Sequence, residues 1–514
     1  MNTMTDSWAL AWQLITHADP ELVHIAALSL QVSATACAIG AVIGLLLGAW
    51  LAVARFPGHG LLVWCVNTLL ALPAVVVGLL VYLLLSRSGP LGEWGILFTP
   101  SAMVIAQSVL VTPLIAALSR RLILAALDDG GSQLQSLGGR PLTTALLMLV
   151  HDRMGVATVL LTAFARAIAE VGAVMIVGGN IAGVTRVMTT TIALETSKGD
   201  LALALAMGIV LLGVVGIVNG AMGLLQWIAG HPGRTPPLAQ ASADSKAPEP
   251  SEAPEPHAPP VPSAQPGGLA PEAKAPPLIQ VEQASVRFGQ VQALQGASLT
   301  LLRGDRLILV GANGSGKTTL LRLLHGLLLP SEGRCERLPL QQPAGRLPRA
   351  AMLFQRPFLL NLSVWRNVWV GLWLAGIPAA QRRARCDQAL ARVGLLPHAQ
   401  RPARTLSGGQ QQRLGLARAL ALEPDILFMD EPTASLDPGA KSEIESLIEK
   451  IAAAGVTIVM STHNLGQAKR LATRVAYLQG GRLIVQRPAA QFFGNAPLPP
   501  EAAQFIQGEL GWGR

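Results

Sequence analysis

The chain has 514 residues, of which 51% are hydrophobic and only 13% are charged. Because a soluble domain carries about 25% charged residues, this deficit excludes a disordered chain, a coiled coil and an ordinary cytosolic enzyme as descriptions of the whole. The net charge of +9 comes from scattered arginines and not from a basic run with interleaved aromatics, so a lipid surface is expected as a partner and nucleic acid is not.

Residues 1–230 contain long uncharged segments and predict a helical membrane domain. About 20 apolar residues span a bilayer as a helix. The pattern predicts five transmembrane helices, with six as the alternative. The expected spans lie near 24–53, 62–86, 99–119, 157–179 and 201–227. The stretch 141–151 is too short to cross and is predicted to be a partly buried surface helix.

The distribution of arginines predicts the orientation of these helices. Residues 1–22 contain no Lys or Arg, whereas the segment between the third and fourth expected spans carries Arg120, Arg121, Arg140 and Arg153. Basic residues in short loops favour the cytoplasmic side. The N-terminus is therefore expected outside, and the chain after the fifth span is expected in the cytoplasm.

Three zones follow the membrane domain. Residues 231–277 are rich in Pro and Ala and predict a disordered linker that acts as a spacer. Residues 278–486 alternate short apolar strands with helical stretches. This alternation predicts an α/β domain with a largely parallel sheet. Residues 487–514 are a short C-terminal tail.

The segment GANGSGKTT fits the phosphate-binding pattern G-x4-G-K-[ST]. It lies between an apolar strand, Arg306–Val310, and an apolar helix, Leu320–Leu328, as the motif requires. Its glycines let backbone N–H groups surround phosphate oxygens at a helix N-terminus. Lys317 supplies a point charge and Thr318 a hydroxyl for Mg²⁺. The predicted nucleotide-binding residues are Gly311, Asn313, Gly314, Ser315, Gly316, Lys317, Thr318 and Thr319.

The segment ILFMDEP, Ile426–Pro432, predicts an apolar strand that ends in two carboxylates. Asp430 fits a partner of Mg²⁺, and Glu431 fits a general base that aligns water on the γ-phosphate. A lone acidic pair after a strand is weak evidence. About 110 residues after a phosphate loop, it becomes strong evidence for nucleotide hydrolysis.

The segment LSGGQQQR, Leu406–Arg413, precedes an expected helix that runs to about Leu422. Ser407, Gly408 and Gly409 place a hydroxyl and free N–H groups at that helix N-terminus, which predicts a second anion site. A capping serine followed by turn glycines would explain Ser407 but not the whole string.

These motifs resemble those of the ATP-binding cassette (ABC) family over essentially all of residues 278–486. In that resemblance LSGGQ is the signature, Ser435-Leu436-Asp437 the D-loop, Gln355 in MLFQRPF the Q-loop glutamine and His463 in STHN the switch histidine. Phe288 in VRFGQ is similar to the aromatic residue that stacks on adenine.

The resemblance implies ATP and Mg²⁺ as ligands and a head-to-tail homodimer with shared sites. The implied catalytic residues are Glu431, His463 and Gln355, and the implied Mg²⁺ contacts are Thr318, Gln355 and Asp430. The implied contacts to the ATP of a second copy are Ser407, Gly408, Gly409 and Gln410, with Asp437 in the D-loop.

The membrane half resembles bacterial importer permeases. SQLQSLG, Ser132–Gly138, is similar to a permease motif that begins Glu-Ala-Ala and ends in Gly. This similarity implies a coupling helix near Gly139–Leu146 that docks on the ATPase, after an exposed turn at Asp128–Gly131. The segment Ala163–Asp200 resembles the permeases for molybdate, sulfate and above all tungstate, through the pattern R-x3-E-x-G-A…GGNI.

Arg166 and Glu170 are four residues apart within the fourth expected span and are predicted to pair on one helix face. Charges within a membrane are costly and usually face a cavity or a partner. Arg166 could line an anion path with Glu170 holding it. Alternatively, the pair fixes helix packing or a gate.

The sequence as a whole predicts a fused permease–ATPase in the bacterial inner membrane that imports an oxyanion, with tungstate as the expected cargo. Molybdate and sulfate remain alternatives. An exporter of lipid or drug and a membrane-tethered regulatory ATPase are alternatives from other classes. The expected partners are a second copy of the chain and an extracytoplasmic oxyanion-binding protein.

Overall fold

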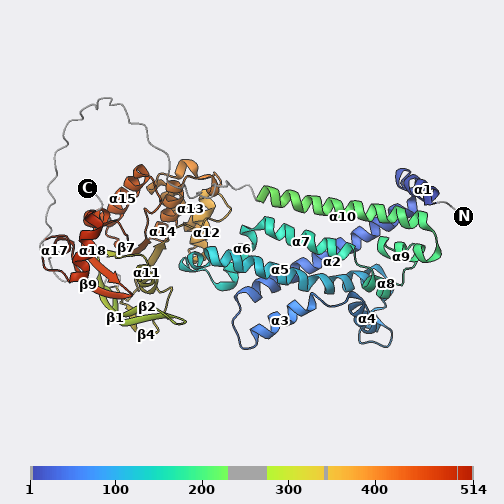
Figure 1. Ribbon diagram of the computed structural model, residues 1–514, viewed down its shortest axis with the longest axis horizontal. Coiled ribbons are helices and arrows are strands. Elements are labelled where there is room, and N and C mark those ends of the chain that lie inside the picture. The colour runs from blue at the N-terminus through green and yellow to red at the C-terminus, as the bar shows by residue number, and fades with distance from the viewer. Residues whose placement is uncertain (1–3, 230–274, 341–344, 495, 512–514) are drawn as a thin grey trace, which may run out of the picture.

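The structure is a computed structural model that describes residues 4–229, 275–340, 345–494 and 496–511. An apolar helical half and an α/β half with a phosphate-binding loop follow each other along the long axis (Figure 1). The predicted fold class is confirmed. The expected linker, 231–277, lies outside the described residues except for its last three positions.

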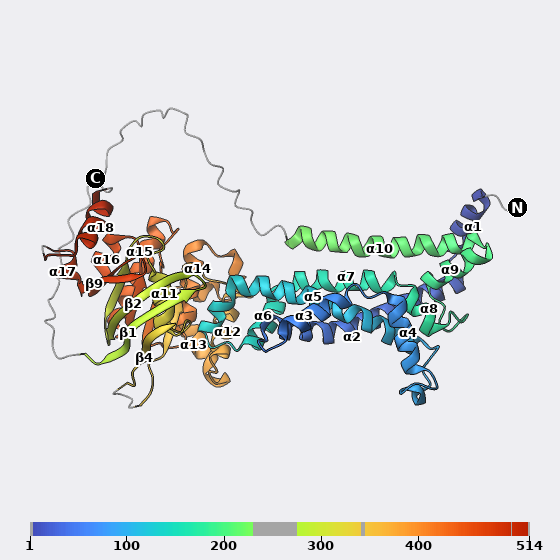
Figure 2. The same ribbon diagram turned by 60° about the horizontal axis from the view of Figure 1, so that its bottom comes forward.

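The helical half is organised around two long helices, α2 and α5, that lie side by side in both views (Figures 1 and 2). Glycines at four-residue spacing on the first of them, Gly40, Gly44 and Gly48, allow this close approach. A Cβ atom at Gly48 would lie 2.1 Å from Ser119 Oγ. The helices are α1 (Met4–Thr16), α2 (Pro20–Val53), α3 (His59–Leu69), α4 (Ala74–Leu85), α5 (Pro100–Ser136), α6 (Pro141–His151), α7 (Arg153–Ile168), α8 (Gly172–Gly178), α9 (Met188–Lys198) and α10 (Leu201–Ala229), with a 3-10 turn, η1 (Gly92–Trp94).

Within the described residues, three helices are long and apolar enough to cross a membrane: α2, α5 and α10. Two bent pairs would raise the number to five if each pair counts as one span. These are α3 with α4, bent by 101°, and α6 with α7, bent by 81°. The first bend interrupts the expected span 62–86, whereas the second lies between residues 151 and 153, before the expected span 157–179 begins. The expected surface helix 141–151 forms as α6 with the predicted limits.

The expected span 62–86 breaks at Pro73, the N-cap of α4, because proline has no N–H and disfavours helix in the residue before it. The expected span 157–179 breaks after Ile168. There the carboxylate of Glu170 accepts hydrogen bonds from the N–H groups of Val171, at 3.1 Å, and Gly172, at 3.0 Å. These contacts start a new helix, α8.

The expectation of an exposed turn at Asp128–Gly131 is wrong. The segment lies inside α5, and Gly130 and Gly131 are buried. A Cβ atom at Gly130 would lie 2.4 Å from the ring of Phe358 in the α/β half. Gly130 therefore permits a close contact between the halves rather than a turn, and α5 extends about 25 Å beyond its expected end near residue 119.

The α/β half contains two sheets. A six-stranded sheet has the order β5-β6-β7-β3-β8-β9, and all its neighbouring pairs are parallel except β8 with β9. A second, antiparallel sheet has the order β2-β1-β4. The largely parallel sheet is as predicted, whereas the antiparallel sheet was not foreseen. The strands are β1 (Pro277–Phe288), β2 (Val291–Leu302), β3 (Arg306–Val310), β4 (Glu332–Arg337), β5 (Ala350–Leu353), β6 (Ile426–Asp430), β7 (Thr457–Ser461), β8 (Arg474–Gln479) and β9 (Arg482–Pro488).

Helices cover the parallel sheet and carry the motifs at their N-termini. The helices of this half are α11 (Lys317–His325), α12 (Val364–Leu374), α13 (Ala379–Arg392), α14 (Gly408–Leu420), α15 (Pro438–Ala453), α16 (Leu465–Leu471), α17 (Ala489–Phe492) and α18 (Pro500–Gly511), with 3-10 turns η2 (Leu396–His398) and η3 (Ala403–Thr405). The core strands β6 and β7 are buried along their whole length. Their carboxyl ends, together with that of β3, position the candidate site.

One hydrophobic cluster runs through both halves. It joins Leu134 of α5, Leu137 just after α5 and Met148 of α6 to Val364 and Leu372 of α12, all of them buried. Because apolar burial stabilises an interface by roughly 25 cal/mol per Å², this continuity holds the halves together.

Candidate functional site

A cleft of about 870 Å³ lies at the carboxyl ends of the central strands. Its wall contains all the predicted nucleotide-loop residues, Gly311–Thr319, together with Gln355, Glu431 and His463. These residues come from four separate stretches of the sequence, so the fold brings together what the motifs predicted. Phe288 is not among the cleft-lining residues. It is half exposed at the end of β1 and pairs with Val291, which does line the cleft.

The loop between β3 and α11 has the backbone shape of a phosphate cradle. Gly311 has φ +148° and Gly316 has φ +100°, conformations that favour glycine. A Cβ atom at Gly311 would also lie 2.2 Å from the carbonyl oxygen of Leu478. The N–H groups of this loop and of the first turn of α11 can therefore surround an anion.

Lys317 is buried at the base of the cradle. Its Nζ donates hydrogen bonds to the carbonyl oxygens of Gly311, at 2.7 Å, and Ala312, at 2.9 Å. Burial lowers the pKa of Lys317, while the nearby carboxylates of Glu431 and Asp430 act in the opposite direction. The ammonium group is thus held by its own loop and is close enough to turn toward a phosphate.

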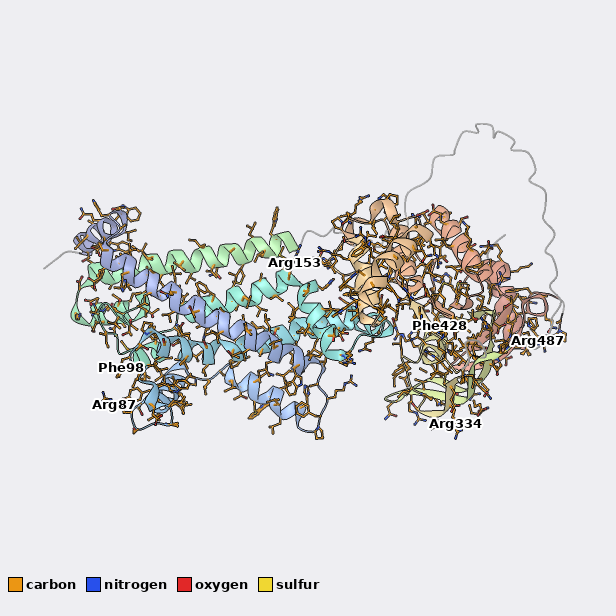
Figure 3. All side chains as sticks on the ribbon, turned by 180° about the vertical axis from the view of Figure 1, so that it is seen from behind. Arg87, Phe98, Arg153, Arg334, Phe428 and Arg487 are labelled. Carbon is orange, nitrogen blue, oxygen red and sulfur yellow. The ribbon has the colours of Figure 1, made fainter. Side chains whose placement is uncertain are left out.

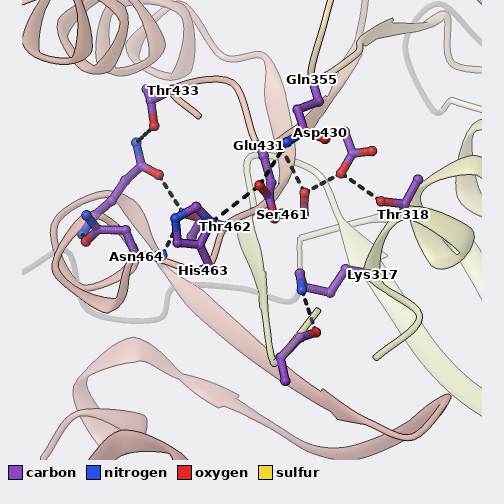
Figure 4. Close-up of polar contacts among 12 residues, drawn as sticks. Lys317, Thr318, Gln355, Asp430, Glu431, Thr433, Ser461, Thr462, His463 and Asn464 are labelled. Atoms are coloured by element: carbon purple, nitrogen blue, oxygen red, sulfur yellow. Dashed lines mark hydrogen bonds and ion pairs between the residues drawn. The ribbon is translucent and has the colours of Figure 1, made fainter. Parts of the chain in front are cut away.

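The carboxylate of Asp430 lies beside the hydroxyl of Thr318. Thr318 Oγ1 donates to Asp430 Oδ1 at 3.1 Å, and Ser461 Oγ donates to the same oxygen at 2.6 Å (Figure 4). A carboxylate and a hydroxyl are oxygen ligands of the kind that Mg²⁺ prefers. The residues present therefore fit the predicted Mg²⁺ site, with Thr318 and Asp430 as its closest pair.

Glu431 is held in a strained position between two other predicted catalytic residues. Its φ of +43° is uncommon for a residue with a side chain, and its N–H donates to Ser461 Oγ at 3.0 Å. The carboxylate Oε2 accepts from Gln355 Nε2 at 3.3 Å and lies 3.3 Å from His463 Nδ1 (Figure 4). The three side chains form one cluster at the phosphate end of the cleft.

The signature residues cap a different helix and do not line the cleft of their own chain. Ser407 is the N-cap of α14, and it forms a reciprocal pair of hydrogen bonds with Gln410. Gly408 and Gly409 form the first turn. Asp437 caps α15, accepting from the N–H of Ala440 at 2.9 Å.

Sequence reasoning missed Ser461, which holds both acidic residues. The parallel pairing of β6 with β7 places Ser461 opposite Asp430. It also missed Val291, Gln292, Ala293, Gly480 and Gly481 of the cleft wall. These residues carry no motif, and only the packing of β2 beside β9 places them there.

The helical half reaches this cluster through Gln133 near the end of α5. Its Nε2 donates to the carbonyl oxygen of Arg356 at 2.7 Å, and its Oε1 accepts from the N–H of Phe358 at 2.7 Å. Oε1 also accepts from Arg418 Nη2 at 3.2 Å. Gln133 therefore holds the backbone immediately after Gln355.

Arg418 is buried at this contact, and burial lowers its pKa to about 10. Its Nη1 donates to the carbonyl oxygen of Phe358 at 2.8 Å. In the part of the chain that the structure describes, no carboxylate pairs with this guanidinium. The neutral amide of Gln133 is therefore one of its few partners.

The expected coupling segment, Gly139–Leu146, is only part of the docking surface. Contacts come from the end of α5 before it and from His151 at the end of α6 after it. His151 Nδ1 accepts from the N–H of Asn361 at 3.1 Å, and its ring packs 4.9 Å from that of Phe358. The extension of α5 displaces the docking contact toward Gln133.

The predicted pairing of Arg166 with Glu170 is wrong. The helix that would have placed them on one face ends at Ile168. The carboxylate of Glu170 instead accepts hydrogen bonds from the N–H groups of Val171 and Gly172 at the start of α8, and no ion pair joins it to Arg166 among the described residues. The side chain of Arg166 is exposed.

A family profile described as "ABC transporter" matches residues 294–434. The nickel import ATP-binding protein NikO of Rhodobacter capsulatus is 38% identical over 43% of this chain and 93% of its own length. The chain belongs to the ABC transporter family. The methionine import ATP-binding protein MetN of Brucella abortus is 36% identical over 47% of this chain and 68% of its own. The phosphate import ATP-binding protein PstB 2 of Natronomonas pharaonis is 35% identical over 45% and 87%.

The ABC assignment sets the chemistry of the cleft. An ABC ATPase domain binds ATP with Mg²⁺ and hydrolyses it in a reaction coupled to transport. ABC ATPases of import systems work as dimers with a membrane-embedded partner. A solved structure of cbiO1 from Clostridium perfringens is 29% identical, covers 46% of this chain and 95% of its own, and has a TM-score of 0.38.

Proposed function

We propose that the chain is a fused half-transporter in which two copies import an oxyanion, tungstate, at the cost of ATP. The observation that carries the proposal is the contact between Gln133 and the segment after Gln355. It links apolar helices directly to the ATPase cluster within one chain. Regulation without transport would not require a buried contact of this kind between the two halves.

Exposed tryptophans support membrane insertion of the helical half. Trp side chains favour the two membrane–water interfaces. On α10, Leu201 and Trp227 are separated by about 39 Å, which matches a bilayer with its headgroup regions. Arg87 and Phe98, on either side of η1, lie at the end far from the ATPase, whereas Arg153 lies near the junction (Figure 3). The exposed tryptophans are Trp8, Trp12 and Trp94 on α1 and η1, and Trp50, Trp64 and Trp227 on α2, α3 and α10.

The proposed orientation is supported by the positions of the basic residues. Arg120 and Arg121 on α5, Arg140 before α6 and Arg153 at the start of α7 lie toward the ATPase, and α1 carries no Lys or Arg. Basic residues on the ATPase side fit a cytoplasmic location for that side. The N-terminus would then face the exterior, where an oxyanion-binding protein would deliver cargo.

Arg166 supports an anion as cargo. It lies 13 residues after Arg153, so it stands about 20 Å along α7, near the middle of a bilayer. An exposed guanidinium at that depth cannot face lipid without a large cost, so it faces a water path or the second copy. Because Glu170 does not pair with it, Arg166 has a positive charge that can attract a dianion.

The choice of tungstate rests on the resemblance of Ala163–Asp200 to tungstate permeases. The ATPase relatives are named for methionine, nickel and phosphate import, so the ATPase domain does not select the cargo. Molybdate and sulfate are the competing cargoes, because they are tetrahedral dianions of similar size.

In the proposed cycle, two chains close head to tail so that Ser407 of each faces the nucleotide loop of the other. Mg²⁺ held at Thr318 and Asp430 would neutralise phosphate charge. Lys317 turns from its loop carbonyls to the outer phosphates. Glu431 aligns a water and accepts its proton, with Gln355 and His463 fixing the carboxylate. Gln133 transmits the movement of the Gln355 segment to α5.

Uptake of labelled tungstate tests the cargo. Cells that produce the chain and its binding protein should accumulate tungstate, and a tenfold excess of sulfate should compete poorly. If sulfate competed with labelled tungstate as well as unlabelled tungstate does at the same concentration, tungstate selectivity would be refuted. The chain would then be a general oxyanion importer.

A further inference from the structure

Gln467 on α16 is a fully buried polar residue that no motif singled out. The residue is 1% exposed, and its amide bonds to the two segments that carry Glu431 and His463. We propose that Gln467 is a positioning residue for ATP hydrolysis, which locks the turn after Glu431 to the turn that presents His463. The inference rests on the catalytic assignment of Glu431 proposed above.

Three hydrogen bonds use nearly the full capacity of the Gln467 amide. Its Oε1 accepts from Thr462 Oγ1 at 2.8 Å. Its Nε2 donates to Thr433 Oγ1 at 3.0 Å and to Glu445 Oε1 at 3.1 Å. The side chain thus joins α16 to three other segments at one point.

The two threonines bonded to Gln467 flank the catalytic cluster. Thr462 immediately precedes His463, and Thr433 follows Glu431 by two residues. Both catalytic side chains come within 3.3 Å of each other only because these two turns lie side by side (Figure 4). A buried amide that bridges the turns fixes this separation, while Glu431 itself is in a strained conformation that needs support.

The rest of the network anchors Gln467 in one orientation. Its N–H donates to Asn464 Oδ1, which caps α16. Glu445 on α15 is held in turn by Arg470, at 2.7 Å between Nη2 and Oε2. With Glu445 oriented as an acceptor and Thr462 as a donor, only an amide satisfies both sides.

This donor–acceptor pattern makes Gln467 hard to replace even by its closest analogue. In a Gln467→Glu variant, two carboxylates would meet where an amide now donates to Glu445, and like charges at this distance repel. An added Glu445→Gln substitution returns one amide and one carboxylate to the pair. The pattern is then reversed but satisfied.

The test measures ATP hydrolysis by the full chain in liposomes. Gln467→Glu should lower kcat by about tenfold or more, because a misplaced catalytic group costs that much, while KM for ATP stays within about twofold. The nucleotide loop lies on another helix, so binding is spared. Gln467→Glu with Glu445→Gln should recover kcat to within about threefold of the native chain, and Glu445→Gln alone should be close to native.

Thr433 provides an independent matched pair that does not introduce charge. Thr433→Val removes the acceptor for Gln467 Nε2 at nearly constant volume and should lower kcat, whereas Thr433→Ser keeps it and should not. Thermal unfolding and ATP affinity verify that each variant is folded. Native kcat in Gln467→Glu, absence of rescue by Glu445→Gln in a folded protein, or equal rates in the two Thr433 variants would overturn the proposal. A native rate in Glu431→Gln would instead refute the assignment of Glu431.

Discussion

Replacing Gln133 by leucine should weaken the contact between the helical half and the ATPase by roughly 10²–10⁴-fold. The substitution removes two hydrogen bonds of 2.7 Å to backbone groups of Arg356 and Phe358 and one of 3.2 Å from the buried Arg418. Each neutral bond contributes about 1 kcal/mol, and a buried cation that loses a partner costs about 1–3 kcal/mol. The expected loss is about 3–5 kcal/mol.

The assay uses the chain cut between residues 252 and 253, outside the described residues, so that association of the halves can be measured as a Kd in detergent. Gln135→Leu is the matched control. It is the same substitution on the same helix two residues away, at an exposed position. If Gln133→Leu and Gln135→Leu give Kd values within about twofold of each other, the contact does not carry the coupling that the structure assigns to it.

Three further results are expected. Glu431→Gln should still bind ATP but hydrolyse it about 10²-fold more slowly; native turnover would exclude Glu431 as the base. A heterodimer of a Lys317→Ala chain with a Ser407→Arg chain should hydrolyse ATP faster than a heterodimer of a doubly substituted chain with a native chain. Only the first heterodimer keeps one intact shared site. The reverse ranking would show that each site lies within one chain. Burial lowers the pKa of His325 to about 4, so the unfolded state gains protons first as pH falls below about 6.5, and the domain should lose about 3 kcal/mol between there and pH 4. In His325→Leu, the stability measured by thermal unfolding should fall less between pH 6.5 and pH 4. An unchanged pH profile would show that His325 does not cause the loss.

The local motifs were predictable because each is a strand, a turn and a helix start in sequence. The loop Gly311–Thr319 and the carboxylates Asp430 and Glu431 follow apolar strands, and parallel strands end at the same edge of a sheet. The fold brings the loop and Glu431 into one cleft, and Asp430 lies beside it, where its carboxylate accepts a hydrogen bond from Thr318. Composition and segment length also sufficed to predict an apolar helical half.

Apart from the Arg166–Glu170 pair, these failures share one physical cause, which is packing between distant segments. The sequence near Gly130 does not predict that the ring of Phe358 lies beside this glycine. The spacing of Arg166 and Glu170 predicted a pair only on the assumption of an unbroken helix. The Glu170 carboxylate instead accepts hydrogen bonds from the free N–H groups of Val171 and Gly172. The roles of Gln467 and Gln133 could not be predicted, because their hydrogen-bond partners lie on other elements.

The central claim is that hydrolysis in the ATPase half drives an oxyanion through the helical half of the same chain. Tungstate uptake and phosphate release should be measured together in proteoliposomes that contain the full chain, with the binding protein on the opposite side from ATP. The native chain should show both, Glu431→Gln neither, and Gln133→Leu phosphate release with little uptake. Steady phosphate release by the native chain with no uptake of tungstate, molybdate or sulfate would contradict the claim.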